Sequence, residues 1–252
     1  MKSNVSSDKF RNQGNRLYQQ IKFEEALLKY NESLCFAVDD EHLALAYANR
    51  SAVYFEMKLH QQCLNNIRLA KEHNYPVEKL AKLQERETRC LELMMQATSI
   101  DSEPFDFFKL SYKANPKIPF IIDDLELKTN AKYGRHIVAK RDLKVGDIIS
   151  IENLFFCVLD ADREYRKDAK PTNTFNFCHF CFNENHLDLI PCRGCNATMY
   201  CSEKCQNSAQ SYHQYECFMS GILQISWDEY NVIRSFFKAL SIVNGSIEEL
   251  EK

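Results

Sequence analysis

The chain has 252 residues, of which 45% are hydrophobic and 27% charged, a composition typical of globular proteins and not of disordered tails. A formal net charge of −3 and the lack of a dense Lys/Arg block argue against binding DNA by charge. The first ten residues lack the apolar core of a signal peptide, and no stretch has the ~18 uninterrupted apolar residues of a membrane span. We therefore expect a protein of the cytoplasm, the nucleus or both, without a membrane segment.

Residues 8–98 predict amphipathic helices, because they contain almost no Pro or Gly and no strand-like alternation. Two segments, 10–30 and 47–67, align at an offset of 37 residues (47 − 10), and residues 77–97 continue as a long helix. Small residues occupy matching positions, Gly14 with Ser51 and Ala26 with Cys63. The pattern resembles the tetratricopeptide repeat (TPR), a helix–turn–helix unit of about 34 residues. This resemblance implies TPR-like repeats over residues 1–100, with a groove that binds proteins.

Five polar residues of this region match positions at which chaperone-binding TPR domains hold an acidic peptide. They are Arg11, Asn15, Asn49, Lys82 and Arg86. In those domains Asn and cationic side chains bind the carboxylates of the peptide C-terminus, and the spacing of four residues puts Lys82 and Arg86 on one helical face. The resemblance implies acidic chaperone C-termini of the Hsp90/Hsp70 type as partners. The alternative is that each of the five is an ordinary solvated surface residue.

After residue 104, short β-branched runs at 121–122, 137–138 and 148–151 predict a small antiparallel sheet. We expect a hairpin turn at residues 144–147, where Gly146 allows a positive φ. The segment KYGRHIVAKRDLKVGDIISIE, residues 132–152, resembles the opening strands of a SET domain, the fold of protein-lysine methyltransferases. The resemblance implies that Tyr133, Gly134 and Arg135 contact S-adenosylmethionine. Alternatively, Gly134 only permits a tight turn.

Seven of the eleven cysteines fall within residues 178–217. Without a secretion signal, clustered thiols are typical of metal ligands and not of disulfides. Together with one histidine they form four pairs, Cys178-x2-Cys181, Cys192-x2-Cys195, Cys201-x3-Cys205 and His213-x3-Cys217. Thiolate and imidazole ligands suit zinc, and eight of them fill two tetrahedral sites with no position left for water. We therefore predict two structural zinc ions. The other four cysteines are expected to be small buried apolar residues; they are Cys35, Cys63, Cys90 and Cys157.

The order and spacing of these pairs resemble the MYND finger. The resemblance implies that the pairs interleave, with Cys178, Cys181, Cys201 and Cys205 on one ion and Cys192, Cys195, His213 and Cys217 on the other, an arrangement that spacing alone leaves open. His179 and His186 do not fit the pairing and are expected at the surface or beside the ligands.

MYND fingers serve protein recognition, often of short proline-containing peptides. Candidates for an exposed recognition groove are Met199, Tyr200, Gln210 and Tyr215. The alternative is that these side chains pack the small core of the finger, and for Tyr200 we favour that alternative.

The order of these parts resembles the SET and MYND domain-containing family, and within it the TPR-bearing branch. It predicts an α+β multidomain chain with TPR-like repeats at 1–100, the N-terminal part of a SET-like domain at 101–177, a MYND finger at 178–217, and a helical start of the SET insert region at 218–252, with a helix at 227–242.

In that family, catalysis depends on an Asn-His-Ser-Cys stretch, a later tyrosine, and a cysteine cluster that holds a third zinc. None of them is found in this sequence. We therefore expect a C-terminally truncated form that is inactive alone, with no catalytic residue to name.

Two functions follow. One is methyl transfer from S-adenosylmethionine to a protein lysine by the complete protein. The other is a zinc-binding adaptor that recruits proteins through the groove and the finger. A transcript read past Lys252 would discriminate between them.

Overall fold

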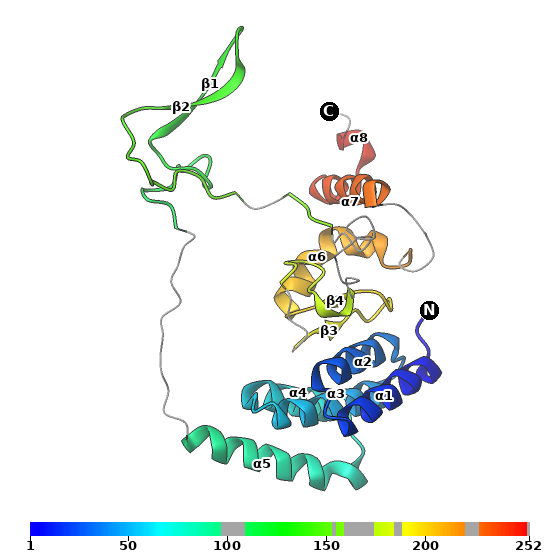
Figure 1. The fold of residues 1–252 in the computed structure, drawn as a ribbon. Coiled ribbons are helices and arrows are strands. Elements are labelled where there is room, and N and C mark those ends of the chain that lie inside the picture. Colours follow the sequence, from blue (N-terminus) through cyan, green and yellow to red (C-terminus); the bar gives the residue numbers. More distant parts are fainter. Residues whose placement is uncertain (97–108, 153–154, 159–173, 184–187, 220–226, 251–252) are drawn as a thin grey trace, which may run out of the picture. The chain divides into compact units, whose positions relative to one another are not determined.

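The computed structural model describes residues 1–252 except 97–108, 153–154, 159–173, 184–187, 220–226 and 251–252 (Figure 1). The chain divides into two compact units, Met1–Thr98 with Phe156–Lys252, and Ser99–Phe155. The helices are α1 (Asn4–Gln19), α2 (Phe23–Phe36), α3 (Asp40–Glu56), α4 (His60–Glu72), α5 (Leu80–Gln96), α6 (Glu203–Glu216), α7 (Trp227–Ile242) and α8 (Ile247–Leu250), with 3-10 turns η1 (Val77–Lys79) and η3 (Thr174–Asn176). The strands are β1 (Leu125–Asn130), β2 (Gly134–Ala139), β3 (Ile190–Pro191) and β4 (Met199–Tyr200). None of the described helices is long and apolar enough to cross a membrane.

The first five helices pack in chain order, each against the next (Figure 1). In addition, α1 contacts α3 and α3 contacts α5, so the odd-numbered helices share one side of the array. Side-chain caps begin two of them, since Ser3 accepts from the amide of Ser6 and Asp39 from the amide of His42. The helical N-terminal region and the C-terminal helix α7 predicted from the sequence are confirmed.

The turns after α1 and α3 repeat one another. Ile21 and Lys58 both have positive φ, 63° and 60°. In each turn the next amide, of Lys22 or Leu59, donates to the carbonyl five residues earlier, at 3.0 and 2.9 Å. The two turns are 37 residues apart (58 − 21), the offset of the sequence alignment. A β-branched residue at positive φ is strained, so helix packing and not local preference holds Ile21 in this conformation.

Helices α1 and α2 approach closely at Gly14. A Cβ at this buried glycine would lie 2.5 Å from Cε1 and 2.8 Å from Cδ1 of Tyr30. Tyr30 is itself 2% exposed, and its hydroxyl donates to Oδ1 of Asn15 at 2.9 Å. The ring therefore cannot move aside without losing this partly buried hydrogen bond.

We expect Gly14→Ala to lower the free energy of unfolding by about 1–3 kcal/mol, the usual cost of overpacking a core. This cost should outweigh the better helix propensity of Ala, about 1 kcal/mol. Urea titration followed by far-UV circular dichroism measures the change. Asn12→Ala, at an exposed position of the same helix, is the matched control and should be neutral or stabilising. A Gly14→Ala protein as stable as wild type would contradict the close approach.

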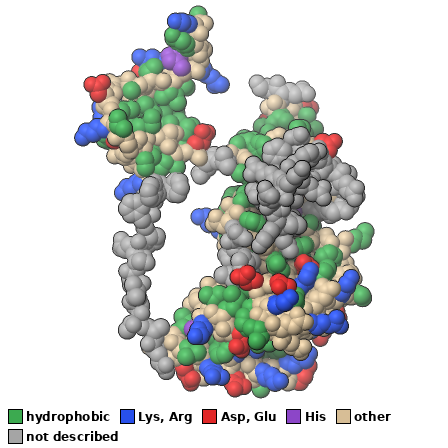
Figure 2. Space-filling model, viewed as in Figure 1, with side chains coloured by type: hydrophobic (Ala, Val, Ile, Leu, Met, Phe, Trp, Pro, Cys, Tyr) green, Lys and Arg blue, Asp and Glu red, His purple; other side chains and the backbone are tan. Residues whose placement is uncertain are grey.

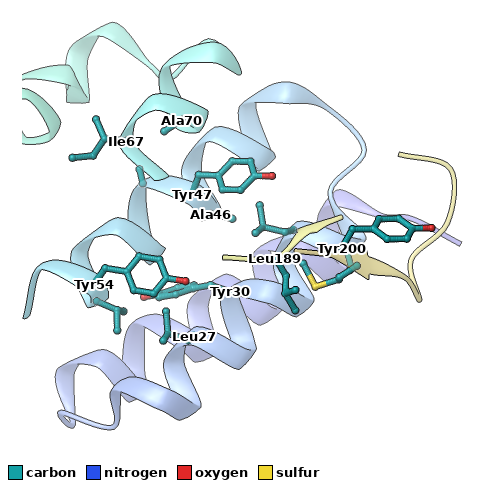
Figure 3. Packing of buried hydrophobic residues seen from close by; sticks show 14 of the residues in the cluster. Leu27, Tyr30, Ala46, Tyr47, Tyr54, Ile67, Ala70, Leu189 and Tyr200 are labelled. Atoms are coloured by element: carbon teal, nitrogen blue, oxygen red, sulfur yellow. The ribbon is translucent and has the colours of Figure 1, made fainter. Parts of the chain in front are cut away.

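The hydrophobic core is continuous from these helices into the finger. Figure 3 shows Leu189 and Tyr200 in the same cluster as Tyr30, Tyr47 and Tyr54. Leu189 and Tyr200 are fully buried. At about 25 cal/mol per Å² of apolar surface removed from water, such large side chains contribute strongly to holding the finger on the helices.

The unit Ser99–Phe155 contains the hairpin β1–β2, paired from Leu125↔Ala139 to Asn130↔Gly134. Isolated bridges, Ala114↔Ile122 and Ile121↔Ser150, extend the antiparallel pairing. Its small core contains Ile121, Ile122 and Leu125. The small sheet predicted from the sequence is therefore present.

The structure corrects the predicted position of the hairpin turn. It lies at residues 131–133, where Oδ1 of Asn130 accepts the amides of Lys132 and Tyr133 at 3.0 and 2.8 Å. Residues 144–147 form a turn closed by the amide of Asp147, which donates to the carbonyl of Lys144 at 3.1 Å, but they do not join two paired strands. Leu143 packs against the small core instead of extending β2.

Candidate functional site

The finger combines a short strand pair with one helix. Strands β3 and β4 pair through Ile190↔Tyr200 and Pro191↔Met199. Ser202 caps α6, its hydroxyl accepting the amide of Cys205 at 3.2 Å. This cap places Cys205 in the first turn of α6. His213 and Cys217 follow at the end of the helix, one turn apart and on one face.

Two groups of four potential ligands form in the finger. The first, the all-cysteine group, contains Cys178, Cys181, Cys201 and Cys205, and the second, the histidine-containing group, contains Cys192, Cys195, His213 and Cys217, with the ligand atoms of each group within 4.8 Å of one another. In the all-cysteine group the sulfur of Cys201 lies 3.6 Å from that of Cys181 and 3.5 Å from that of Cys205.

In the histidine-containing group the sulfurs of Cys192 and Cys217 are 3.7 Å apart. Nε2 of His213 lies 3.3 Å from the sulfur of Cys192 and 3.7 Å from that of Cys195.

These distances fit zinc. A tetrahedral ion with Zn–S bonds of about 2.3 Å separates its sulfurs by roughly 3.8 Å, close to the spacings above. Each group has four soft or borderline ligands and no other atom is needed to complete it. The arrangement supports two zinc ions in closed, structural sites, one with four thiolates and one with three thiolates and an imidazole. The grouping is the interleaved one, which residue spacing alone leaves open.

The thiols of the histidine-containing group share protons unequally. A hydrogen bond from Cys192, together with one from His213, lowers the pKa of Cys195 to about 2. The same hydrogen bond and burial raise the pKa of Cys192, and burial raises that of Cys217. The amide of Gly194 donates to the sulfur of Cys192 at 3.3 Å. Thiolate is the form that binds zinc, so the other two thiols must lose their protons when the ion binds.

Gly194 is a residue of the site that the sequence prediction does not include. A Cβ at this position would lie 2.6 Å from the sulfur of Cys217. Any side chain here would displace a ligand from the histidine-containing group. The available signal was a glycine directly before the second cysteine of Cys192-x2-Cys195.

His179 supports the all-cysteine group without belonging to it. Burial lowers the pKa of His179 to about 4, so its ring is neutral near pH 7. Nδ1 accepts the amide of Met199 at 3.2 Å, and the carbonyl of His179 accepts the hydroxyl of Tyr212 at 3.2 Å. These contacts brace the first cysteine pair against β4 and α6. His186 lies outside the described residues.

The structure corrects one of the four candidates for a recognition groove on the finger. Met199 is fully buried, because β4 faces the core, and cannot line an exposed groove. Tyr200 is also fully buried, which agrees with the core position favoured for it. Gln210 is exposed, and the ring of Tyr215 stacks on Phe237 at 5.2 Å.

Of the four cysteines outside the finger, three are buried packing residues and one is only partly buried. Cys35, Cys63 and Cys90 are fully buried. Burial raises the pKa of Cys35 and Cys63 above the ordinary value of a thiol. Cys157 is only partly buried.

The five candidate peptide-binding residues lie on α1, α3 and α5, the helices that share one side of the array. Nδ2 of Asn49 donates to Oδ1 of Asn15 at 2.8 Å, which joins α3 to α1. Arg86 donates to the hydroxyl of Ser51 at 2.8 Å. Arg11 pairs with Asp8 at 2.6 Å, while the side chain of Lys82 is exposed.

The three candidate cofactor residues lie at the tip of the β1–β2 hairpin. Gly134 has φ 60° and opens β2. Tyr133 is 62% exposed, with Nζ of Lys132 4.8 Å from its ring centroid. Arg135 pairs with Thr129 across the hairpin. In this unit the glycine therefore serves a turn, and its neighbours are accessible.

Comparison with known proteins places the chain. Residues 178–217 match the family model of the MYND finger. The chain is 30% identical over 225 residues to protein-lysine N-methyltransferase SMYD4 of Danio rerio, covering 86% of this chain and 30% of that protein. It is 23% identical over 273 residues to the Homo sapiens protein of the same name, covering 85% and 34%.

A SET and MYND domain-containing protein of Dictyostelium discoideum is 31% identical over 129 residues, which are 47% of this chain and 30% of that protein. The chain thus spans 30% to 34% of the length of these three relatives. No solved structure matches. With its finger and a similarity that runs along most of its length, the chain belongs to the SET and MYND domain-containing family, as an SMYD4-like protein.

Proposed function

We propose that the chain serves protein-lysine methylation as its recruiting part, with TPR-like helices and the MYND finger binding proteins in the cytoplasm or nucleus. The observation that carries this proposal is the similarity over 85–86% of the chain to proteins named protein-lysine N-methyltransferase, together with the finger. In this proposal the unit Ser99–Phe155 contains the opening strands of a SET domain. In this proposal the zinc ions hold the finger and do not take part in methyl transfer.

The enzyme function assigns S-adenosylmethionine to the hairpin tip. Tyr133, Gly134 and Arg135 would supply one edge of the cofactor site, and a positive φ at Gly134 lets the backbone approach a ligand closely. An exposed hairpin tip buries little of a cofactor that normally occupies a concave pocket.

We therefore expect no detectable S-adenosylmethionine binding by residues 1–252 alone in calorimetry. Measurable binding that is lost in Arg135→Ala but kept in Lys128→Ala, a cation of the same hairpin, would favour a catalytic role for this chain over the adaptor role.

The adaptor function rests on the shared side of α1, α3 and α5. Nε of Arg11 is buried and, within the part of the chain that the structure describes, has no hydrogen-bond partner. Arg86 of α5 donates to the carbonyl of Ala48 and the hydroxyl of Ser51, on either side of Asn49 in the sequence of α3. Arg11 lies one helical turn before Asn15 in α1. An acidic C-terminus offers the carboxylates that such a set of donors binds.

A peptide with acidic residues and a free C-terminal carboxylate, of the chaperone type, should bind this groove. Asn15→Ala combined with Lys82→Glu should weaken it about 10- to 100-fold, since hydrogen bonds to charged groups contribute about 1.5–3 kcal/mol. Calorimetry with the free-acid peptide and its C-terminal amide measures the effect. Arg68→Glu, the same charge change on the exposed surface of α4, is the control. Equal affinity for wild type and the double variant would remove this function.

Figure 2 shows acidic and basic side chains intermingled over the visible face of the helical region. This face of the described residues therefore carries no separate basic patch of the kind that binds nucleic acid. The proposed ligands remain proteins. Acidic peptides would bind the groove, and proline-containing peptides would bind exposed residues of the finger such as Gln210.

A further inference from the structure

We propose that zinc binding by the finger and the folding of α2–α4 are coupled through Arg50, so that the helices and the finger form one zinc-dependent body. The proposal goes beyond recruitment, because it assigns the finger a part in stabilising the helical repeats.

Arg50 of α3 is the centre of the contact. It is the largest of the fully buried side chains, with 0% exposure. Its guanidinium donates to Oδ1 of Asn66 and Oδ1 of Asn31, both at 2.7 Å. It lies 5.2 Å from the ring centroid of Tyr47 and 6.0 Å from that of Tyr54. A buried charge is costly unless it is paired and hydrogen-bonded, so its remaining partners matter.

Those remaining partners come from the finger. Arg50 donates to the backbone carbonyl of Leu189 at 2.8 Å, and its NH2 atom lies 3.8 Å from a carboxylate oxygen of Asp188. In the described ranges, Asp188 supplies the carboxylate that the structure pairs with Arg50. Nδ2 of Asn65 and of Asn66 donate to the two oxygens of Asp188 at 3.1 Å each. Helices α3 and α4 therefore both bind residues 188–189.

The helices bind each zinc group at a backbone carbonyl three residues before its first ligand. The carbonyl of Leu189, bound by Arg50, is three residues before Cys192, the first ligand of the histidine-containing group. The carbonyl of Phe175 accepts Nδ2 of Asn31 at 3.0 Å and is three residues before Cys178, the first ligand of the all-cysteine group. Asn31 of α2 contacts both Arg50 and Phe175, so one buried network binds the approach to both metal sites.

Coupling follows from this arrangement. The segment containing Asp188 and Leu189 leads directly into β3, which pairs with β4. Zinc ligands lie on both sides of this strand pair in the sequence, so the ions fix its position. Without zinc this segment loses its fixed position, and Arg50 is left among Tyr47 and Tyr54 without its carboxylate. Opening of α3 then becomes the way to hydrate the guanidinium. Because coupling between two sites is reciprocal, intact helices should also raise the zinc affinity of the finger.

Hydrogen exchange of the full, zinc-loaded chain tests the first half of the proposal. After addition of a zinc chelator, amides of α2–α4 should exchange at least about tenfold faster, within the ~5- to 150-fold range of typical coupling. Peptides from the hairpin β1–β2, in the other compact unit, are the internal reference and should not change. Unchanged protection of α2–α4 would overturn the proposal.

Substitution of Arg50 tests the second half. In competition with a chromogenic chelator, Arg50→Met should bind zinc about tenfold more weakly than wild type, while Arg68→Met, at an exposed site on α4, should match wild type. If Arg50→Met does not fold, Asp188→Asn decides, since it removes the paired charge at a partly exposed position. Wild-type zinc affinity in the folded Arg50 variant, or in Asp188→Asn when that variant decides, would show that the two parts are independent.

Discussion

Removal of zinc is expected to unfold the finger at residues 178–217 and to be the largest single perturbation of this chain. Structural zinc contributes apparent free energies of about 10–16 kcal/mol in zinc-finger peptides, comparable to the roughly 5–15 kcal/mol by which whole domains are commonly stable. The strand pair β3–β4 has only two residues in each strand, and a pair of that length has no independent stability. The ions therefore hold the finger together.

The two ions should leave at different rates. In the all-cysteine group, Cys181 is exposed and both Cys201 and Cys205 are half-buried. In the histidine-containing group three of the four ligands are buried, and only Cys217 is half-buried. A chelator reaches exposed sulfur first, so release should show a fast phase from the all-cysteine group and a slow phase from the histidine-containing group.

Native mass spectrometry should find two zinc ions in the wild-type chain and one in Cys181→Ser, with the fast phase missing. Cys195→Ser should remove the slow phase and should destabilise the chain more, because its ligand group is more buried. Cys157→Ser, a partly exposed cysteine outside the finger, is the control. A folded, zinc-free wild-type chain would refute the prediction, and a single release phase would refute the difference between the groups.

The finger was the most predictable part because its information is local in sequence. Each ligand pair, such as Cys178 with Cys181, is close enough for both members to reach one ion, and the pairs have a recognisable order. The helices were predictable for a similar reason, since the 37-residue offset reappears as two equivalent left-handed turns at Ile21 and Lys58.

Features that depend on distant residues were not predictable. Arg50 and Leu189 are 139 positions apart, and nothing near Arg50 in the sequence shows that a helical arginine is fully buried. Met199 was offered as a recognition residue because a recognition groove needs exposed apolar side chains. Whether such residues are exposed depends on which face β4 turns toward the core. The hairpin turn was misplaced because two glycine turns compete, and the side chain of Asn130 selects the first.

Arg234→Met is expected to lower the free energy of unfolding of the unit that contains the finger by about 3–5 kcal/mol, the cost of breaking a buried ion pair on one side. Arg234 of α7 and Glu216 of α6 are 4% and 1% exposed. Two nitrogens of Arg234 donate to the two oxygens of Glu216, at 2.9 and 2.7 Å. The guanidinium also lies 4.5 Å from the ring centroid of Tyr212. Although burial lowers the pKa of Arg234, the bonds to Glu216 raise it above its ordinary value, and the group stays charged.

Because Glu216 directly precedes the ligand Cys217, loss of its partner should reach the zinc finger as well as α7. Urea titration of the zinc-loaded chain measures the effect, and Lys238→Met, which removes another cation of α7 bonded to Ser211, is the matched control. The double variant Arg234→Met, Glu216→Leu should recover much of the loss, since replacing both members of a buried pair by apolar residues is often neutral. If the double variant were as unstable as the sum of the two single variants, the charges would act independently, and α7 would be held on α6 by its apolar contacts.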